Sequence, residues 1–223
     1  MDVRTMSTLF ALLTVIADVS VLAIAVIGTG ARWPGGLRRA RDGMCDLLSE
    51  TGLWLAWLVA LTATLGSLYY SEVAHFLPCK LCWFQRIGIY PLAVVLLIAA
   101  LRRDRAIRFY AIPVAAISAA ISTYHYQLER FPNQASPSCS VEAPCTVVWV
   151  WRFHYISIPM MALSAALLVI ALLWATGRGD PARWKLEDPI LPDPGWGLAH
   201  RGDEPYTRST RRDRRALRPM KEG

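Results

Sequence analysis

The chain has 223 residues, of which 54% are hydrophobic, and it carries a formal net charge of +7. Its apolar residues fall into blocks of about 20 separated by charged stretches, a pattern typical of proteins that cross a membrane several times and not of soluble domains. Most of the positive charge lies next to these blocks, which argues against a nucleic-acid-binding protein and indicates control of membrane topology instead.

The first apolar block runs from Met6 to Gly28. It is longer than the apolar core of a cleaved signal peptide, which spans about 7 to 15 residues, and no clear Ala-x-Ala cleavage site follows it. We therefore expect an additional, retained transmembrane helix over residues 1–28. Asp18 lies inside this block. A carboxylate at that depth is costly, so we expect a protonated or hydrogen-bonded interfacial group rather than a proton relay.

A basic linker follows over residues 29–51. It contains Arg32, Arg38, Arg39 and Arg41, and the segment Trp33–Gly36 is expected to break regular structure because it combines proline with two glycines. The arginines predict that this linker is cytoplasmic. Cys45 should then be an unpaired thiol on the reducing side of the membrane.

Four further apolar blocks are each long enough to span a bilayer. They cover Gly52–Tyr70, Trp83–Leu101, Phe109–Leu128 and Tyr155–Thr176. Arg102, Arg103, Arg105 and Arg108 lie between the third and fourth of the five predicted helices, which is a strong cytoplasmic signal. The remainder, residues 177–223, is a basic, proline-rich tail that is expected to be disordered and cytoplasmic. The predicted fold is an all-α membrane protein of five helices.

Four of the five cysteines lie in the two remaining loops. Cys79 and Cys82 precede the third predicted helix, and Cys139 and Cys145 lie between the fourth and the fifth. If the five helices alternate in direction, both loops fall opposite the arginine-rich segments. That side is extracytoplasmic and oxidising, so disulfides can persist there.

Three kinds of site could use these four cysteines. A four-thiolate zinc site would need Cys139 and Cys145 to be closer in sequence, because zinc half-sites usually separate their cysteines by two to four residues. Two inert structural disulfides are a second alternative, although closing a ring as short as Cys79–Cys82 gains little entropy. The third alternative is a redox relay, in which two exchangeable disulfides pass electrons from a soluble partner to a membrane acceptor.

The residues around Cys82 favour the relay. Cys82 should lie in the first turn of its helix, where the helix dipole stabilises a thiolate. Arg86 is four residues further on and therefore lies on the same helix face, just inside the membrane on its outer side. It could stabilise the Cys82 thiolate and donate hydrogen bonds to a carbonyl of a membrane quinone. An arginine that snorkels to lipid phosphate has the same spacing, so this alternative stays open.

Four sequence motifs resemble those of the DsbB family of disulfide bond formation proteins, most closely its BdbC branch. They are Pro78-Cys79-Lys80-Leu81-Cys82-Trp83-Phe84-Gln85-Arg86, Tyr124-His125-Tyr126-Gln127-Leu128, Pro144-Cys145-Thr146 and Tyr155-Ile156-Ser157-Ile158-Pro159-Met160. The resemblance covers about Gly52 to Thr176 and implies a four-helix catalytic bundle over residues 52–176, preceded by the extra helix. The order of the motifs also fits, because the Cys-x-x-Cys pair comes first.

The resemblance implies a role for each site residue. Cys79 and Cys82 would form the catalytic pair near the quinone, with Cys82 facing it. Arg86 would bind the quinone, which would be ubiquinone or menaquinone, and His125 would lie near it. The second catalytic pair, Cys139 and Cys145, would meet a thioredoxin-fold oxidase resembling DsbA or BdbD. The spacing from Cys139 to Cys145 is shorter than in the best-known members, which leaves open which of the two cysteines the partner attacks.

The resemblance thus implies a thiol:quinone oxidoreductase in the bacterial cytoplasmic membrane, with its redox-active loops extracytoplasmic. No metal and no nucleic acid are expected to take part. The main alternative is a non-catalytic membrane scaffold protein whose disulfides are structural.

Overall fold

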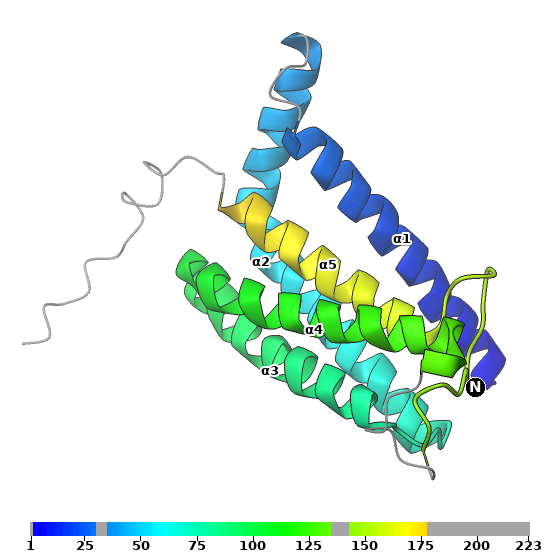
Figure 1. The fold of residues 1–223 in the computed structure, drawn as a ribbon. Coiled ribbons are helices and arrows are strands. Elements are labelled where there is room, and N and C mark those ends of the chain that lie inside the picture. The colour runs from blue at the N-terminus through cyan, green and yellow to red at the C-terminus, as the bar shows by residue number, and fades with distance from the viewer. Residues whose placement is uncertain (1, 30–34, 135–142, 178–223) are drawn as a thin grey trace, which may run out of the picture. The chain divides into compact units, whose positions relative to one another are not determined.

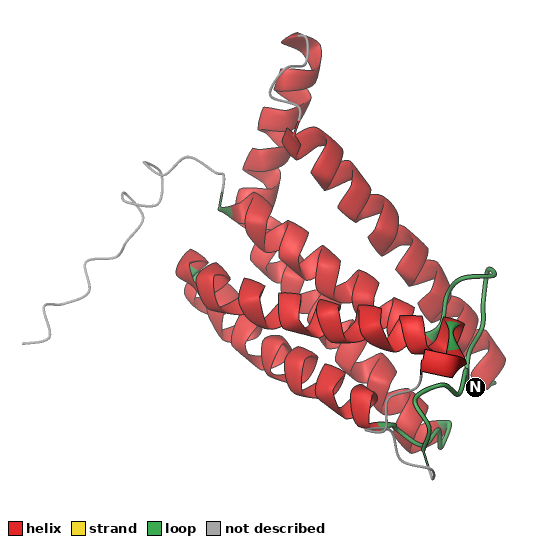
Figure 2. Ribbon diagram, in the orientation of Figure 1, coloured by secondary structure: helices red, strands yellow, loops and turns green. Residues whose placement is uncertain are grey.

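The computed structural model describes residues 2–29, 35–134 and 143–177. Cys139 and the predicted tail beyond Gly177 lie outside these residues. Five helices in the described part are long and apolar enough to cross a membrane. Figure 2 shows that, between them, the described chain forms loops and short helical turns and no strand. These helices confirm the predicted all-α membrane fold.

The long helices correspond one to one with the five predicted spans. Their bounds are α1 Val3–Thr29, α2 Gly35–Leu68, α3 Lys80–Arg102, α4 Arg108–Arg130 and α5 Ile158–Thr176. Helices α2 to α5 pack as a bundle in which α5 contacts both α2 and α4, and α3 contacts both of these as well. Helix α1 packs mainly against α5 and has little contact with α2. Figure 1 shows α1 along the outside of the bundle, with the N-terminus near the loop that precedes α5.

Helix α2 is longer than predicted because it begins inside the basic linker, at Gly35. The residues from Leu37 to Glu50 include three leucines and three arginines and contain no proline, so the helix can continue through them. A π-helical turn, Tyr69–Val73, extends α2 at its other end. His75, with φ of 54°, then turns the chain towards the Cys-x-x-Cys segment.

Helix α5 starts three residues later than predicted. Arg152 and Ile156 pair with each other across a tight turn, which keeps Tyr155 and Ile156 out of the helix. Ser157 is extended and forms the N-cap, and Pro159 occupies the first turn, where a missing N–H costs nothing.

The loops that carry the cysteines meet at one end of the bundle. Phe76 from the first loop stacks on Trp149 from the second, with ring centroids 4.9 Å apart. Phe76 also stacks on Tyr70 at the end of α2, at 5.7 Å. These contacts confirm that the two loops share one side of the protein.

Small residues bring α3 and α4 close together below the loops. A Cβ built on Gly88 would lie 2.9 Å from Cβ of Ser118, so this crossing tolerates no side chain at residue 88. Close helix contact through small residues is common in membrane proteins. On α4, Ser118, Ser122 and His125 share one buried face, and the close crossing therefore holds His125 against the start of α3.

Candidate functional site

Cys79 and Cys82 lie at the N-terminus of α3 as a free dithiol, with their sulfurs 2.9 Å apart. Cys79 is the N-cap residue: its backbone is extended, and its Sγ accepts a hydrogen bond from the backbone N–H of Cys82 at 3.3 Å. Cys82 lies in the first helical turn, as predicted. The helix terminus nevertheless donates its hydrogen bond to Cys79, because an N-cap side chain accepts from the N–H groups of the first turn.

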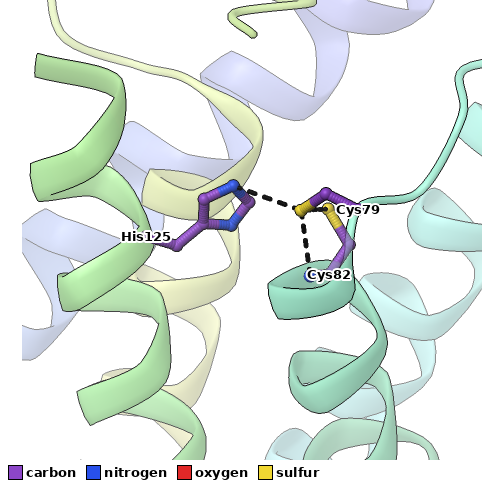
Figure 3. A group of neighbouring side chains, drawn as sticks. All are labelled: Cys79, Cys82 and His125. Atoms are coloured by element: carbon purple, nitrogen blue, oxygen red, sulfur yellow. Dashed lines mark hydrogen bonds between the residues drawn. The ribbon is translucent and has the colours of Figure 1, made fainter. Parts of the chain in front are cut away.

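His125 approaches the dithiol from α4 (Figure 3). Its Nε2 lies 3.5 Å from Sγ of Cys79, and its Nδ1 lies 3.2 Å from Nε2 of Gln85. The amide nitrogen of glutamine can only donate, so Nδ1 of a neutral His125 accepts and Nε2 carries the proton. The imidazole therefore donates its hydrogen bond to the sulfur of Cys79.

These contacts stabilise a thiolate at Cys79. The hydrogen bond from the thiol of Cys82 is the largest cause, the hydrogen bond from His125 adds to it, and together they lower the pKa of Cys79 to about 4 in spite of its burial. A thiol with so low a pKa is ionised at neutral pH and is the attacking and leaving group that disulfide exchange requires.

The thiolate predicts a specific pH dependence in the reduced protein. We expect the ultraviolet absorbance of one thiolate to persist from pH 8 down to about pH 5 and to disappear as the pH falls through about 4. Because the folded pKa lies below the ordinary thiol value of about 8.5, the stability gained from this ionisation is complete above about pH 8.5 and is lost progressively as the pH falls to about 4. The Cys79→Ser variant provides the control spectrum. Absorbance that develops only above pH 8 would contradict the assignment.

Cys145 from the second loop lies beside this pair. It is disulfide-bonded, its side chain is 1% exposed, and it packs with Cys79 and Leu128 in one buried cluster that Cys82 also touches. Its predicted disulfide partner, Cys139, lies outside the described residues, so that pairing stays a prediction. The structure thus brings three of the four predicted catalytic cysteines together.

Arg86 lies one turn below Cys82 and is held by α2. Its Nε donates to Oγ of Ser67 at 3.1 Å and its Nη2 to the Ser67 carbonyl at 3.3 Å. The hydroxyl of Tyr90 also donates to Oγ of Ser67, at 3.1 Å. The guanidinium of Arg86 lies over the ring of Trp83, with its central carbon 5.2 Å from the ring centroid. In the described part of the chain, the Nη1 donors have no hydrogen-bond partner and can serve a ligand.

A cavity of about 560 Å³ opens beside Cys82 and Arg86. Helices α1, α2, α3 and α5 line it, mostly with apolar side chains, and Trp149 lines it from the second loop. His125 does not line this cavity; it lies on the other side of the dithiol, against Cys79. The two residues predicted to bind the quinone therefore have different surroundings.

Asp18, the carboxylate inside the first helix, has a hydrogen-bond partner. The hydroxyl of Tyr155 donates to its Oδ2 at 3.5 Å and so links α1 to the segment that precedes α5. This contact fits the expectation of a hydrogen-bonded interfacial carboxylate.

Three residues near the site were not assigned a role from the sequence. Gln85 is three residues after Cys82, and Glu129 is four residues after His125, so helical spacing alone could have placed each on the face of the predicted site residue. Glu129 is 9% exposed, and its Oε2 has no hydrogen-bond partner among the described residues. Nothing in the sequence pointed to Ser67, because its contact with Arg86 joins two different helices.

The donor atoms of Cys79, Cys82 and His125 all lie within 4.8 Å of one another, a grouping that could in principle hold a metal ion. Two sulfurs bound to one tetrahedral zinc at about 2.3 Å would be about 3.8 Å apart. The observed separation of 2.9 Å is shorter than that, so the two sulfurs do not have the spacing of a zinc half-site.

Comparison with known proteins points to one family. The family model described as "Disulfide bond formation protein DsbB" matches residues 49–176. Disulfide bond formation protein C of Bacillus subtilis is 42% identical over 122 residues, which cover 54% of this chain and 88% of the relative. A probable disulfide formation protein of Deinococcus radiodurans is 45% identical over 140 residues, covering 58% of this chain and 91% of that protein. No solved structure matches the chain.

Proposed function

Because the chain belongs to the DsbB family of disulfide bond formation proteins, we propose that it reoxidises an extracytoplasmic thioredoxin-fold oxidase and passes the electrons to a quinone. The activity would be that of a protein-dithiol:quinone oxidoreductase. The observation that carries the proposal is the burial of Cys145 beside Cys79 and Cys82, which joins the two cysteine loops in one site.

The sulfur chemistry proceeds by thiolate exchange. The partner's thiolate attacks Sγ of Cys139, breaks the Cys139–Cys145 disulfide and releases Cys145 as a thiolate. Cys145 then attacks Sγ of Cys79, and Cys82 leaves as a thiolate. The partner's second thiolate attacks the partner sulfur bound to Cys139, which releases the oxidised partner and the Cys139 thiolate. The Cys139 thiolate then attacks Sγ of Cys145, and Cys79 leaves as a thiolate. The Cys139–Cys145 disulfide is thereby restored, and Cys79 and Cys82 hold the two electrons.

The residues next to the dithiol fit a quinone. The cavity beside Cys82 is largely apolar, and Arg86 offers it donors of the kind that a quinone carbonyl accepts. A bound quinone supplies a two-electron, two-proton acceptor, which balances the oxidation of one dithiol. The roles of the chain are to hold that acceptor against Cys82, to keep Cys79 ionised through His125, and to exclude water with apolar walls.

The proposed location is the bacterial cytoplasmic membrane, with both cysteine loops extracytoplasmic. Its support is the separation of charge along the bundle. Arg102 and Arg108 lie at the end of α3 and the start of α4, opposite the cysteine loops. Arg105, between them, donates to the Ser49 carbonyl on α2 at 2.8 Å, so the basic segments meet at that end.

One experiment tests activity and orientation together. Sealed vesicles of known orientation that contain this protein and a quinone are mixed with a reduced thioredoxin-fold partner. We expect the partner to be oxidised and the quinone to be reduced in equal amounts, and only where the cysteine loops face the added partner. Partner oxidation no faster than in vesicles without the protein would favour the scaffold alternative.

A further inference from the structure

Helix α1 lies outside the residues that the family model matches, yet it forms one wall of the cavity beside Arg86. The lining residues of α1 recur at helical spacing, as in Phe10, Thr14, Ala17 and Ile24. One continuous face of α1 therefore faces the cavity along most of the length of the helix.

The cavity is as long as the membrane core is thick. Along α2 its lining extends from Leu48 to Ser67, a rise of about 28 Å at about 1.5 Å per residue. The hydrocarbon core of a bilayer is about 30 Å thick. The space thus runs from the headgroup end, where Cys82 lies, towards the opposite side of the bundle.

Charge is confined to one end of this space. Among the described residues that line it, Arg86 is the only one with a charged side chain. The hydroxyl groups of α1 that line the cavity are hydrogen-bonded to the backbone of the same helix. Thr14 Oγ1 donates to the Phe10 carbonyl at 2.8 Å, and Ser20 Oγ donates to the Ile16 carbonyl at 2.7 Å. The long wall therefore offers its ligand an apolar surface.

We propose that α1 completes a channel for the isoprenoid tail of the quinone, an inference that rests on the proposed function. The channel begins at the polar end beside Cys82 and Arg86 and continues along an apolar path, which matches a ligand with a polar ring and a long hydrocarbon tail. On α1, Phe10 lies at the end of the channel where the quinone ring would bind. A Cβ built on Gly66, the residue before Ser67, would lie 3.2 Å from the phenyl ring of Phe10. Ala17 is two turns further along, about 10 Å from that end.

The test compares two quinones with the same ring, one with a long isoprenoid tail and one with a methyl group in its place. Tryptophan fluorescence of the full chain in detergent measures the dissociation constant of each. In Ala17→Phe we expect the long-tailed quinone to bind at least about tenfold more weakly, because the tail must leave the ring site through the narrowed channel. The tail-less quinone should bind within twofold of wild type, since its site is about two turns away.

Val19→Phe is the matched control, since residue 19 is 60% exposed on the outer face of the same helix and does not line the cavity. It should change neither constant. Ser20→Phe narrows the channel at a less buried position and should reproduce the selective loss if Ala17→Phe proves too unstable to measure.

Three results would overturn the channel. They are unchanged binding of the long-tailed quinone in both folded channel variants, an equal loss for both quinones, and loss of co-purified phospholipid with no loss of quinone. The last result would assign the space to a lipid acyl chain. Failure of the proposed function gives a different result, because wild type would then bind neither quinone.

Discussion

A thioredoxin-fold partner that keeps its attacking cysteine but lacks its resolving cysteine should accumulate as a mixed disulfide with this protein. Attack requires one accessible sulfur and a good leaving thiolate on the other. Cys145 is 1% exposed, so an incoming protein cannot reach its sulfur without rearrangement. We therefore expect attack at Cys139, with Cys145 released towards Cys79. Gel electrophoresis without reductant should show an adduct that disappears on reduction.

Single serine variants separate the steps of this relay. Cys139→Ser should abolish the adduct, whereas Cys79→Ser should leave it able to form and should prevent turnover. An adduct that persists without Cys139 but requires Cys79 would show that the two pairs have exchanged roles. If no thioredoxin-fold protein of the same cell forms an adduct, the disulfides are structural.

Arg86→Met should weaken quinone binding by about one to two powers of ten. Methionine keeps much of the apolar stem but removes the charge-assisted hydrogen bond to the quinone carbonyl, worth about 1.5 to 3 kcal/mol. The Cys79–Cys82 disulfide should still form, because neither sulfur is hydrogen-bonded to Arg86. The measurement is the quinone Michaelis constant, together with the dissociation constant of the reduced protein.

Ser67→Ala is the matched control for Arg86. It removes the hydroxyl that accepts from Nε but leaves the guanidinium charge and the bond to the Ser67 carbonyl. We expect a smaller loss than in Arg86→Met. A Michaelis constant that is unchanged in Arg86→Met would instead indicate that this arginine serves the lipid headgroups.

The sequence was sufficient to predict the five helices and the position of Cys82 in the first turn of α3. Apolar blocks of membrane length placed all five spans, because hydropathy depends only on local composition. The boundaries at Gly35 and Ile158 differ from those expected, since each depends on local choices that hydropathy does not report: helix propensity through the linker, and the Arg152–Ile156 turn.

The sequence could not predict which side chains from other helices contact the site residues. The spacing of Cys82 and Arg86 indicated a shared face, but nothing in it indicated that Ser67 would hold the guanidinium. The backbone N–H at the start of α3 also donates to the sulfur of Cys79 and not to that of Cys82, because the cap depends on the backbone conformation of Cys79. The wall that α1 contributes to the cavity likewise depends on packing between distant segments.

The thiolate that Cys82 and His125 stabilise at Cys79 affects the reduction potential of the pair. Stabilising one thiolate stabilises the reduced form, which makes the Cys79–Cys82 disulfide a stronger oxidant. Above the pKa of about 4 of Cys79, and while the second thiol keeps its proton, reduction takes up one proton for two electrons. The potential should then change by about 30 mV per pH unit, instead of the about 59 mV of an ordinary dithiol, in titrations against a redox buffer. Such a pair would hold its oxidising strength more evenly than an ordinary dithiol in a compartment whose acidity follows the surroundings of the cell.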